Sequence, residues 1–224
     1  MDDRPKYYLT IIFVFTGLYI SAQVNDASLW LSLNVEKKIT PSWSVLFTEE
    51  VRMFENITEV GVIFSDLGIA YRIDKRFKLS ANYRFIKKKQ LDDSYETRQR
   101  YYFDFSYREK LKPFMLTLRS RFQSQYAEVF SSPEGAVPEL YFREKLTLKL
   151  EILKRITPYV YTEFFFPIGE PERSPVDNLR LCAGMDYSFN KSHAVDLFYM
   201  IQREYNVNNP VTYYIIGLGY YFVF

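Results

Sequence analysis

Most of the chain alternates between apolar and polar residues with a period of two. In the segment 28–36 the apolar face consists of Leu29, Leu31, Leu33 and Val35. In the segment 77–85 it consists of Phe77, Leu79, Ala81, Tyr83 and Phe85. Successive side chains of a β-strand point to opposite faces, so alternation sustained over eight or more residues predicts strands.

Short turns and longer polar segments separate the predicted strands in regular order. The short turns fall at 72–77, 108–114, 153–159 and 189–195. The longer segments lie near Asn56 and at 87–96, 127–138, 167–178 and 205–211. Short turns at one end and longer loops at the other are typical of outer-membrane barrels. The pattern therefore predicts an all-β fold, an antiparallel up-and-down transmembrane β-barrel.

The number of strands follows from the same segmentation. Five hairpins and one final segment make eleven, whereas bacterial single-chain barrels have an even number of strands. We therefore expect ten strands, with the first segment outside the wall. The alternative is twelve, in which residues 24–28 and a divided segment supply the additional strand.

Alternation alone does not say which face points outward, but three features favour a membrane barrel. Aromatic residues gather near predicted strand ends, as interfacial girdles do. The predicted strands are longer than those of ordinary globular sheets. The last segment places Tyr220, Phe222 and Phe224 on one apolar face. This ending resembles the C-terminal assembly signal of bacterial outer-membrane barrels, which implies recognition by the barrel-assembly machinery.

The first 22 residues have the pattern of a secretory signal peptide. Arg4 and Lys6 precede an apolar stretch at 7–20, and Ser21 and Ala22 are small residues before the predicted cleavage point. A single membrane anchor is the alternative, but about 14 apolar residues fall short of the roughly 20 that span a bilayer. We expect a signal peptide at 1–22 and a barrel domain at 23–224. Cys182 is the only cysteine, so no intrachain disulfide can form.

Composition excludes some partners. Hydrophobic residues make up 48% of the chain and charged residues 25%, with a mean hydropathy of -0.21. The formal net charge is only +2, so no polyanion partner such as nucleic acid is indicated.

Three motifs carry a resemblance to a known family. They are LWLSLNVEKKITPSW at 29–43, RQRYY at 98–102 and GLGYYF at 217–222. Together with the overall pattern they resemble DUF2490, a domain of unknown function found in outer-membrane β-barrels of Bacteroidota. The resemblance covers 28–224. It implies location and architecture, and it brings no known activity.

Charged residues on the polar faces are the candidate functional residues. If those faces line the lumen, one sector is basic and consists of Arg98, Arg100, Arg119, Arg121, Arg143 and Lys145. A second sector is acidic and consists of Glu163, Asp186, Asp196 and Glu204. Such sectors either neutralise each other as an internal network or line a narrow channel. A basic row would also bind an anionic solute or a lipid phosphate through arginine.

We expect an outer-membrane protein of a Gram-negative bacterium, porin-like, in contact with membrane lipid and lipopolysaccharide. The alternative is a secreted soluble β-barrel that binds an apolar ligand, with its apolar faces turned inward. Enzymatic activity is not indicated, since His193 is the only histidine and no serine lies in a G-x-S-x-G motif. One histidine and one cysteine do not suggest a metal site, and no cofactor motif is present.

Overall fold

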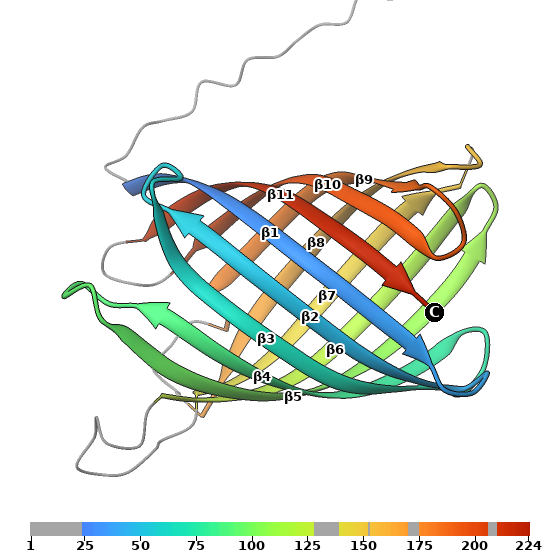
Figure 1. Cartoon of the computed structure of the whole chain (residues 1–224), viewed down its shortest axis with the longest axis horizontal. Helices are drawn as coiled ribbons and strands as arrows, with labels where there is room; N and C mark the ends of the chain where they lie inside the picture. Colours follow the sequence, from blue (N-terminus) through green and yellow to red (C-terminus); the bar gives the residue numbers. More distant parts are fainter. Residues whose placement is uncertain (1–23, 128–138, 152, 170–174, 206–209) are drawn as a thin grey trace, which may run out of the picture.

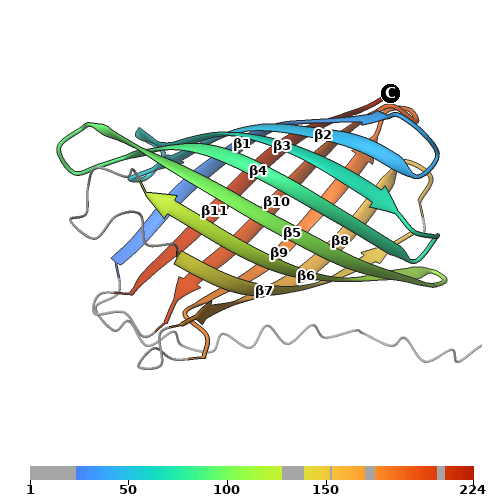
Figure 2. The same cartoon turned by 90° about the horizontal axis from the view of Figure 1, so that it is seen from below.

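The computed structural model describes residues 24–127, 139–151, 153–169, 175–205 and 210–224. The predicted signal peptide at 1–22 lies outside these residues. The described chain forms one closed barrel of eleven β-strands (Figures 1 and 2). The strands are β1 (Val24–Lys38), β2 (Trp43–Phe54), β3 (Glu59–Arg72), β4 (Phe77–Lys89), β5 (Tyr95–Leu111), β6 (Phe114–Ala127), β7 (Glu139–Leu150), β8 (Ile156–Ile168), β9 (Asn178–Ser188), β10 (His193–Glu204) and β11 (Val211–Val223).

The expected strand number, ten or twelve, is wrong. Neighbouring strands along the chain pair antiparallel, but β1 and β11 pair in parallel and close the barrel. An even number is required only when every pair is antiparallel, and one parallel pair allows an odd number. Figure 1 shows the consequence: β1 and β11 run side by side in the same direction, so the described chain enters the wall at one end and leaves it at the other.

The parallel seam runs the full length of the wall. Its register extends from Val24 opposite Val211 to Glu36 opposite Val223. Beyond the paired strands, the backbone N–H of Lys38 donates to the carbonyl of Phe224 at 2.8 Å. Because this pairing closes the barrel, the described sheet has no open edge with unsatisfied backbone groups.

Glycine gives the seam room for large inward side chains. A Cβ atom on Gly217 would lie 1.9 Å from a ring carbon of Phe198. Phe198 packs against an internal apolar cluster of Trp30, Cys182, Met200 and Ile215. A residue with a side chain at position 217 would therefore displace that packing.

Three of the tight turns at one end, the turn end, share one hydrogen-bond arrangement. Asp74 Oδ1 accepts from the backbone N–H groups of Arg76 at 2.6 Å and Phe77 at 2.8 Å. Thr40 and Asn190 accept in the same way from their own turns. These bonds to the charged form hold the pKa of Asp74 below its ordinary value. Their stabilising effect is therefore present at neutral pH and is lost as the pH falls through that lowered pKa.

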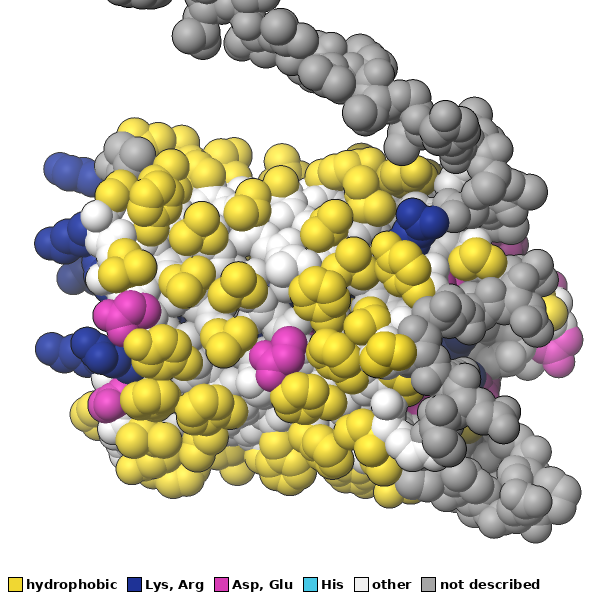
Figure 3. All heavy atoms as spheres, turned by 180° about the vertical axis from the view of Figure 1, so that it is seen from behind, with side chains coloured by type: hydrophobic (Ala, Val, Ile, Leu, Met, Phe, Trp, Pro, Cys, Tyr) yellow, Lys and Arg dark blue, Asp and Glu magenta, His cyan; other side chains and the backbone are white. Residues whose placement is uncertain are grey.

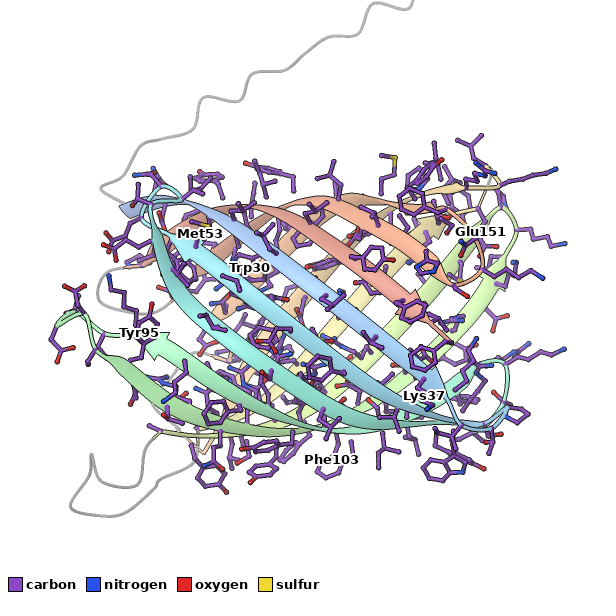
Figure 4. The ribbon with its side chains drawn as sticks, viewed as in Figure 1. Trp30, Lys37, Met53, Tyr95, Phe103 and Glu151 are labelled. Carbon is purple, nitrogen blue, oxygen red and sulfur yellow. The ribbon has the colours of Figure 1, made fainter. Side chains whose placement is uncertain are left out.

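The apolar faces of the strands point outward. Phe103 is 62% exposed and Leu67 is 57% exposed, and Phe103 points away from the barrel in Figure 4. Figure 3 shows an apolar band around the wall, with Lys and Arg side chains projecting from the turn end. The soluble alternative required these faces to point inward, so that orientation is wrong.

The structure makes the seam testable with a disulfide. A Cβ on Gly219 would lie 3.0 Å from the Oγ of Ser32, which matches the reach of a disulfide between those two positions. With Cys182 replaced by alanine, we expect Ser32→Cys/Gly219→Cys to oxidise. The bond should change the mobility of the unfolded chain on a non-reducing gel.

The matched control is Ser32→Cys/Tyr221→Cys, which shifts the pair by two residues along β11. It should stay reduced under the same conditions. Equal oxidation of both pairs would contradict the register of the parallel seam.

Candidate functional site

The lumen holds a polar cavity of about 430 Å³ in the half of the barrel nearer the longer loops, the loop end. Its basic lining residues are Arg52, Arg84, Arg100, Arg119, Arg121, Arg143, Lys145 and Arg180. Its acidic lining residues are Glu50, Glu139, Glu163, Asp177 and Glu204. Alternation of the strands aims these side chains inward, since their neighbours in sequence face out. The cavity lining thus carries more positive than negative charge.

Glu163 is the centre of this arrangement. Its side chain is 3% exposed, and its Oε1 accepts from Arg119 at 2.5 Å and from Arg143 at 2.7 Å. Arg180 Nη1 lies 3.5 Å from Oε2. Three arginines, one each from β6, β7 and β9, therefore point at the single carboxylate of Glu163 on β8. One negative charge cannot neutralise three positive charges, so this part of the lumen keeps a positive potential.

Two further cations at the cavity have no carboxylate partner among the described residues. Arg100 donates to the side-chain oxygen of Gln125, whose amide nitrogen donates to Glu139 at 3.0 Å. Lys145 Nζ lies 3.5 Å from the ring centre of Tyr161. A neutral amide and an aromatic face stabilise a cation less than a carboxylate does. Arg100 and Lys145 are therefore open to an additional anion.

A second cavity of about 380 Å³ occupies the turn end, and Arg121 lines both cavities. Arg121 forms a two-pronged ion pair with Asp104 at 2.6 and 2.7 Å. Beside it, Arg84 and the Tyr102 hydroxyl both donate to Asp66, at 2.7 and 2.5 Å. Residues of this paired layer line both cavities, since Arg84 belongs to the loop-end cavity and Asp66, Tyr102 and Asp104 belong to the turn-end cavity.

Several arginines of the lumen stack their guanidinium groups on aromatic rings. The guanidinium carbon of Arg52 lies 3.6 Å from the ring centre of Trp30. The corresponding distances are 3.7 Å for Arg84 over Phe64 and 3.7 Å for Arg121 over Tyr102. Stacking covers one face of each guanidinium and leaves its edge free for hydrogen bonds. The rings thus fix where the donor groups point.

The structure brings together most of the predicted basic residues. Those that line the loop-end cavity are Arg100, Arg119, Arg121, Arg143 and Lys145. Arg98 does not line either cavity, and its Nε donates to Glu96 at 2.7 Å.

The predicted acidic residues do not form a sector of their own. Glu163 lies among the arginines and Glu204 lines the same cavity. Asp186 accepts from Lys149 at 2.5 Å, and Asp196 accepts from Tyr159 at 2.8 Å. The acidic residues of the later strands therefore do not stand apart from the basic residues, because Glu163 and Asp186 pair with cations of the preceding strands.

The charged lumen residues that were not predicted include Arg52, Arg84, Arg180, Asp66 and Asp104. A signal was present for each, since all five occupy inward positions of alternating segments. Arg84 stands opposite Asp66 in the register of β3 and β4. Assigning every charged residue on the polar face of each strand to the lumen would have identified them.

The predicted assembly residues lie at the turn end of the last strand. Tyr220 and Phe222 point outward, and the Tyr220 hydroxyl lies 2.5 Å from His193 Nδ1. Phe222 stacks on His193 and on Phe224, with ring centres 4.8 and 5.0 Å apart. His193 is thus part of an outer aromatic rim.

The described residues contain no group of three or more His, Cys, Asp and Glu side chains arranged to hold a metal ion. They also contain no helix of the length and apolarity needed to cross a membrane.

The chain belongs to the family described as protein of unknown function (DUF2490), whose model matches residues 27–213. No curated protein matches the chain. Solved structures that share its fold include the following two. The β domain of the Bordetella autotransporter BrkA has a TM-score of 0.52 at 14% identity, covering 81% of this chain and 83% of that one. The NanC porin has a TM-score of 0.52 at 11% identity, covering 84% and 93%.

The role of Glu163 leads to a stability prediction. Replacing it by glutamine leaves three inward arginines around a neutral group. Removal of one partner from a buried ion network costs about 3–5 kcal/mol. We therefore expect Glu163→Gln to lower the free energy of unfolding by that amount, as measured by denaturant unfolding in detergent micelles.

Glu204→Gln serves as the matched control. Glu204 lines the same cavity, and its carboxylate accepts only the backbone N–H of Val211, at 3.2 Å, among the described residues. This variant should change the free energy of unfolding by no more than about 1 kcal/mol. Equal effects of the two variants would show that Glu163 does not hold the cluster together.

Proposed function

We propose that this protein is an outer-membrane β-barrel whose lumen binds small anions and allows them to cross. One observation carries the proposal: Arg119, Arg143 and Arg180 share the single carboxylate of Glu163. The cations that lack a carboxylate partner, Arg100 and Lys145, line the same cavity. Positive charge that the described chain leaves uncompensated favours an anion from solution.

The chemistry of the donors suggests which anions fit. A guanidinium presents paired N–H groups that match the two oxygens of a carboxylate or the oxygens of a phosphate. Such groups attract anions more strongly inside a barrel than in bulk water, since the dielectric constant there is lower. Rings of arginine and lysine select anions in membrane pores for the same reason. A cavity of about 430 Å³ has room for a small organic acid or an inorganic oxyanion.

The two cavities suggest a route. An anion that enters at the loop end meets Arg100 and then the cluster around Glu163, where Lys145 lies opposite Glu163 in the register of β7 and β8. Arg121 extends to the turn-end cavity, because it lines both. To pass, the anion shares Arg121 with Asp104, which stays in place. The nearby Asp104 charge weakens the hold of Arg121 on the anion, and conduction requires binding weak enough for the anion to leave.

Membrane placement is supported by the outward apolar faces and by aromatic rims at the turn end. We infer that the barrel lies in the outer membrane of a Gram-negative bacterium, in contact with lipid and lipopolysaccharide. Tyr220, Phe222 and Phe224 are proposed to engage the barrel-assembly machinery. The autotransporter β domain and the porin share the fold, which agrees with this placement. The proposal includes no enzymatic activity and no cofactor.

The anion proposal is tested in planar lipid bilayers. With a potassium chloride gradient across the bilayer, we expect a reversal potential that indicates preference for chloride over potassium. Arg100→Gln should reduce that preference, since it removes one uncompensated positive charge from the cavity. The matched control Lys154→Gln removes an exposed charge in a turn and should leave the preference unchanged. Preference for cations, or the absence of conductance, would contradict the proposal.

Membrane placement is tested separately. Leu118 is 41% exposed on the outer face of β6. Arginine near the middle of a membrane barrel wall costs about 2–4 kcal/mol. We expect Leu118→Arg to lower the stability of the barrel in lipid vesicles by that amount. Leu118→Met, which keeps the volume and polarity, should cost less than about 1.5 kcal/mol.

The location itself is checked by fractionation and by gels of boiled and unboiled samples. The protein should be recovered with the membranes, and boiling should change its mobility because the closed barrel unfolds. Recovery as a soluble protein without such a change would contradict the membrane placement.

A further inference from the structure

The outer wall carries two carboxylates at half height. Arg143 and Lys145 line the lumen, so Glu144 between them points outward. Glu50 lines the lumen as well, so Glu49 points outward. Each lies near the centre of its strand: Glu144 is the sixth of 12 residues in β7, and Glu49 is the seventh of 12 in β2. Figure 3 shows an acidic side chain in the middle of an otherwise hydrophobic face.

The two carboxylates differ in how they are satisfied. Glu49 lies opposite Ser65, whose hydroxyl donates to its Oε2 at 2.6 Å. Glu144 Oε2 is covered by neighbouring atoms and accepts no hydrogen bond. No ion pair of Glu144 is present among the described residues either. Glu49 thus has a hydrogen-bond donor within the barrel, and Glu144 has none among the described residues.

Two hydroxyl groups accompany Glu144 at the same height. Ser120 lies directly opposite it in the register of β6 and β7. Thr162 of β8 lies diagonally from it, opposite Leu146. Neither hydroxyl forms a hydrogen bond among the described residues. Ser120 is the seventh of 14 residues in β6, and Thr162 is the seventh of 13 in β8. These three residues, Ser120, Glu144 and Thr162, form a polar row across the middle of the outer wall.

Such a row is unfavourable against lipid. Hydrocarbon offers no hydrogen bonds, so an unsatisfied polar group there costs free energy. Polar side chains at membrane depth accordingly tend to face other protein and to hydrogen-bond across the contact. The wall beside the row is also indented. An outer groove of about 590 Å³ borders Thr162, with the short side chain of Ala183 between Val160 and Tyr199. Small residues let a neighbouring protein approach closely.

We propose that the polar row is the contact through which two copies of this chain form a dimer in the membrane. The row contains both an acceptor, Glu144, and two donors, the hydroxyls of Ser120 and Thr162, so it is complementary to itself. A two-fold axis along the membrane normal brings residues of equal height together. Each Glu144 then accepts a hydrogen bond from a hydroxyl of the second copy through its other oxygen, Oε1, because Oε2 is covered within its own barrel. Outward positions at half height carry no Lys or Arg in the described strands, so this surface offers hydroxyl donors rather than an ion pair.

The inference rests on the proposed membrane location and is independent of anion binding. The experiment compares three proteins in lipid nanodiscs or mild detergent: the wild type, Glu144→Leu and Glu49→Leu. Glu49→Leu is the matched control, because it removes an outward carboxylate of the same height elsewhere on the wall. We expect light scattering to show a dimer for the wild type. For Glu144→Leu we expect a dimer dissociation constant at least about tenfold higher, since the symmetry of the dimer doubles each lost contact. Glu49→Leu should dimerise like the wild type.

A cysteine cross-link keeps the test valid if Glu144→Leu does not fold. With Cys182 replaced by alanine, Leu146→Cys places a thiol beside the row, and Leu67→Cys places one on the outer face of β3. Cross-linking at position 146 and not at 67 supports the dimer. A monomeric wild type, equal effects of Glu144→Leu and Glu49→Leu, or equal cross-linking at both positions overturns it. Recovery of the protein in the soluble fraction instead overturns the membrane location itself.

Discussion

The parallel pairing of β1 with β11 is the interaction on which the rest of the structure depends. An open sheet of this length would expose two rows of unpaired backbone donors and acceptors. Parallel pairing is slightly weaker per residue than antiparallel pairing. The seam compensates through its length, since it extends from Val24 to the hydrogen bonds at Phe224. Closure then fixes which face of each strand is inside.

Closure also explains the distribution of charge. Once the barrel is closed, every inward position shares one narrow space, so charges from distant strands must find partners across it. Arg119 and Glu163 are 44 residues apart in sequence and form an ion pair at 2.5 Å. The arginines are held by the aromatic rings beneath them as much as by carboxylates. The charged side chains that line the loop-end cavity include more positive than negative ones.

The local features of this fold were predictable from the sequence, and its long-range features were not. Alternation in 77–85 predicts β4, and the turn residues at 72–77 predict the hairpin, because both depend on neighbours in sequence. The seam joins residues near 24–36 to residues near 211–223, and no local pattern encodes a parallel pair so far apart. Without it, the even-number rule led to the wrong strand count.

In the candidate site, too, the features that depend on one strand were predictable and those that depend on distant strands were not. Alternation identifies Arg100, Arg119 and Arg143 as inward, since that needs only the face of one strand. It does not show that Glu163 lies among them, which requires the register of β6 through β9 and the closure of the barrel. The period of two separates the inward and outward faces at almost every position. Glu144 departs from that separation, with an unsatisfied acceptor on an apolar wall. An outward carboxylate without a hydrogen-bond donor costs free energy in the isolated barrel. The proposed dimer accounts for this cost, because the second copy supplies hydroxyl donors to Glu144.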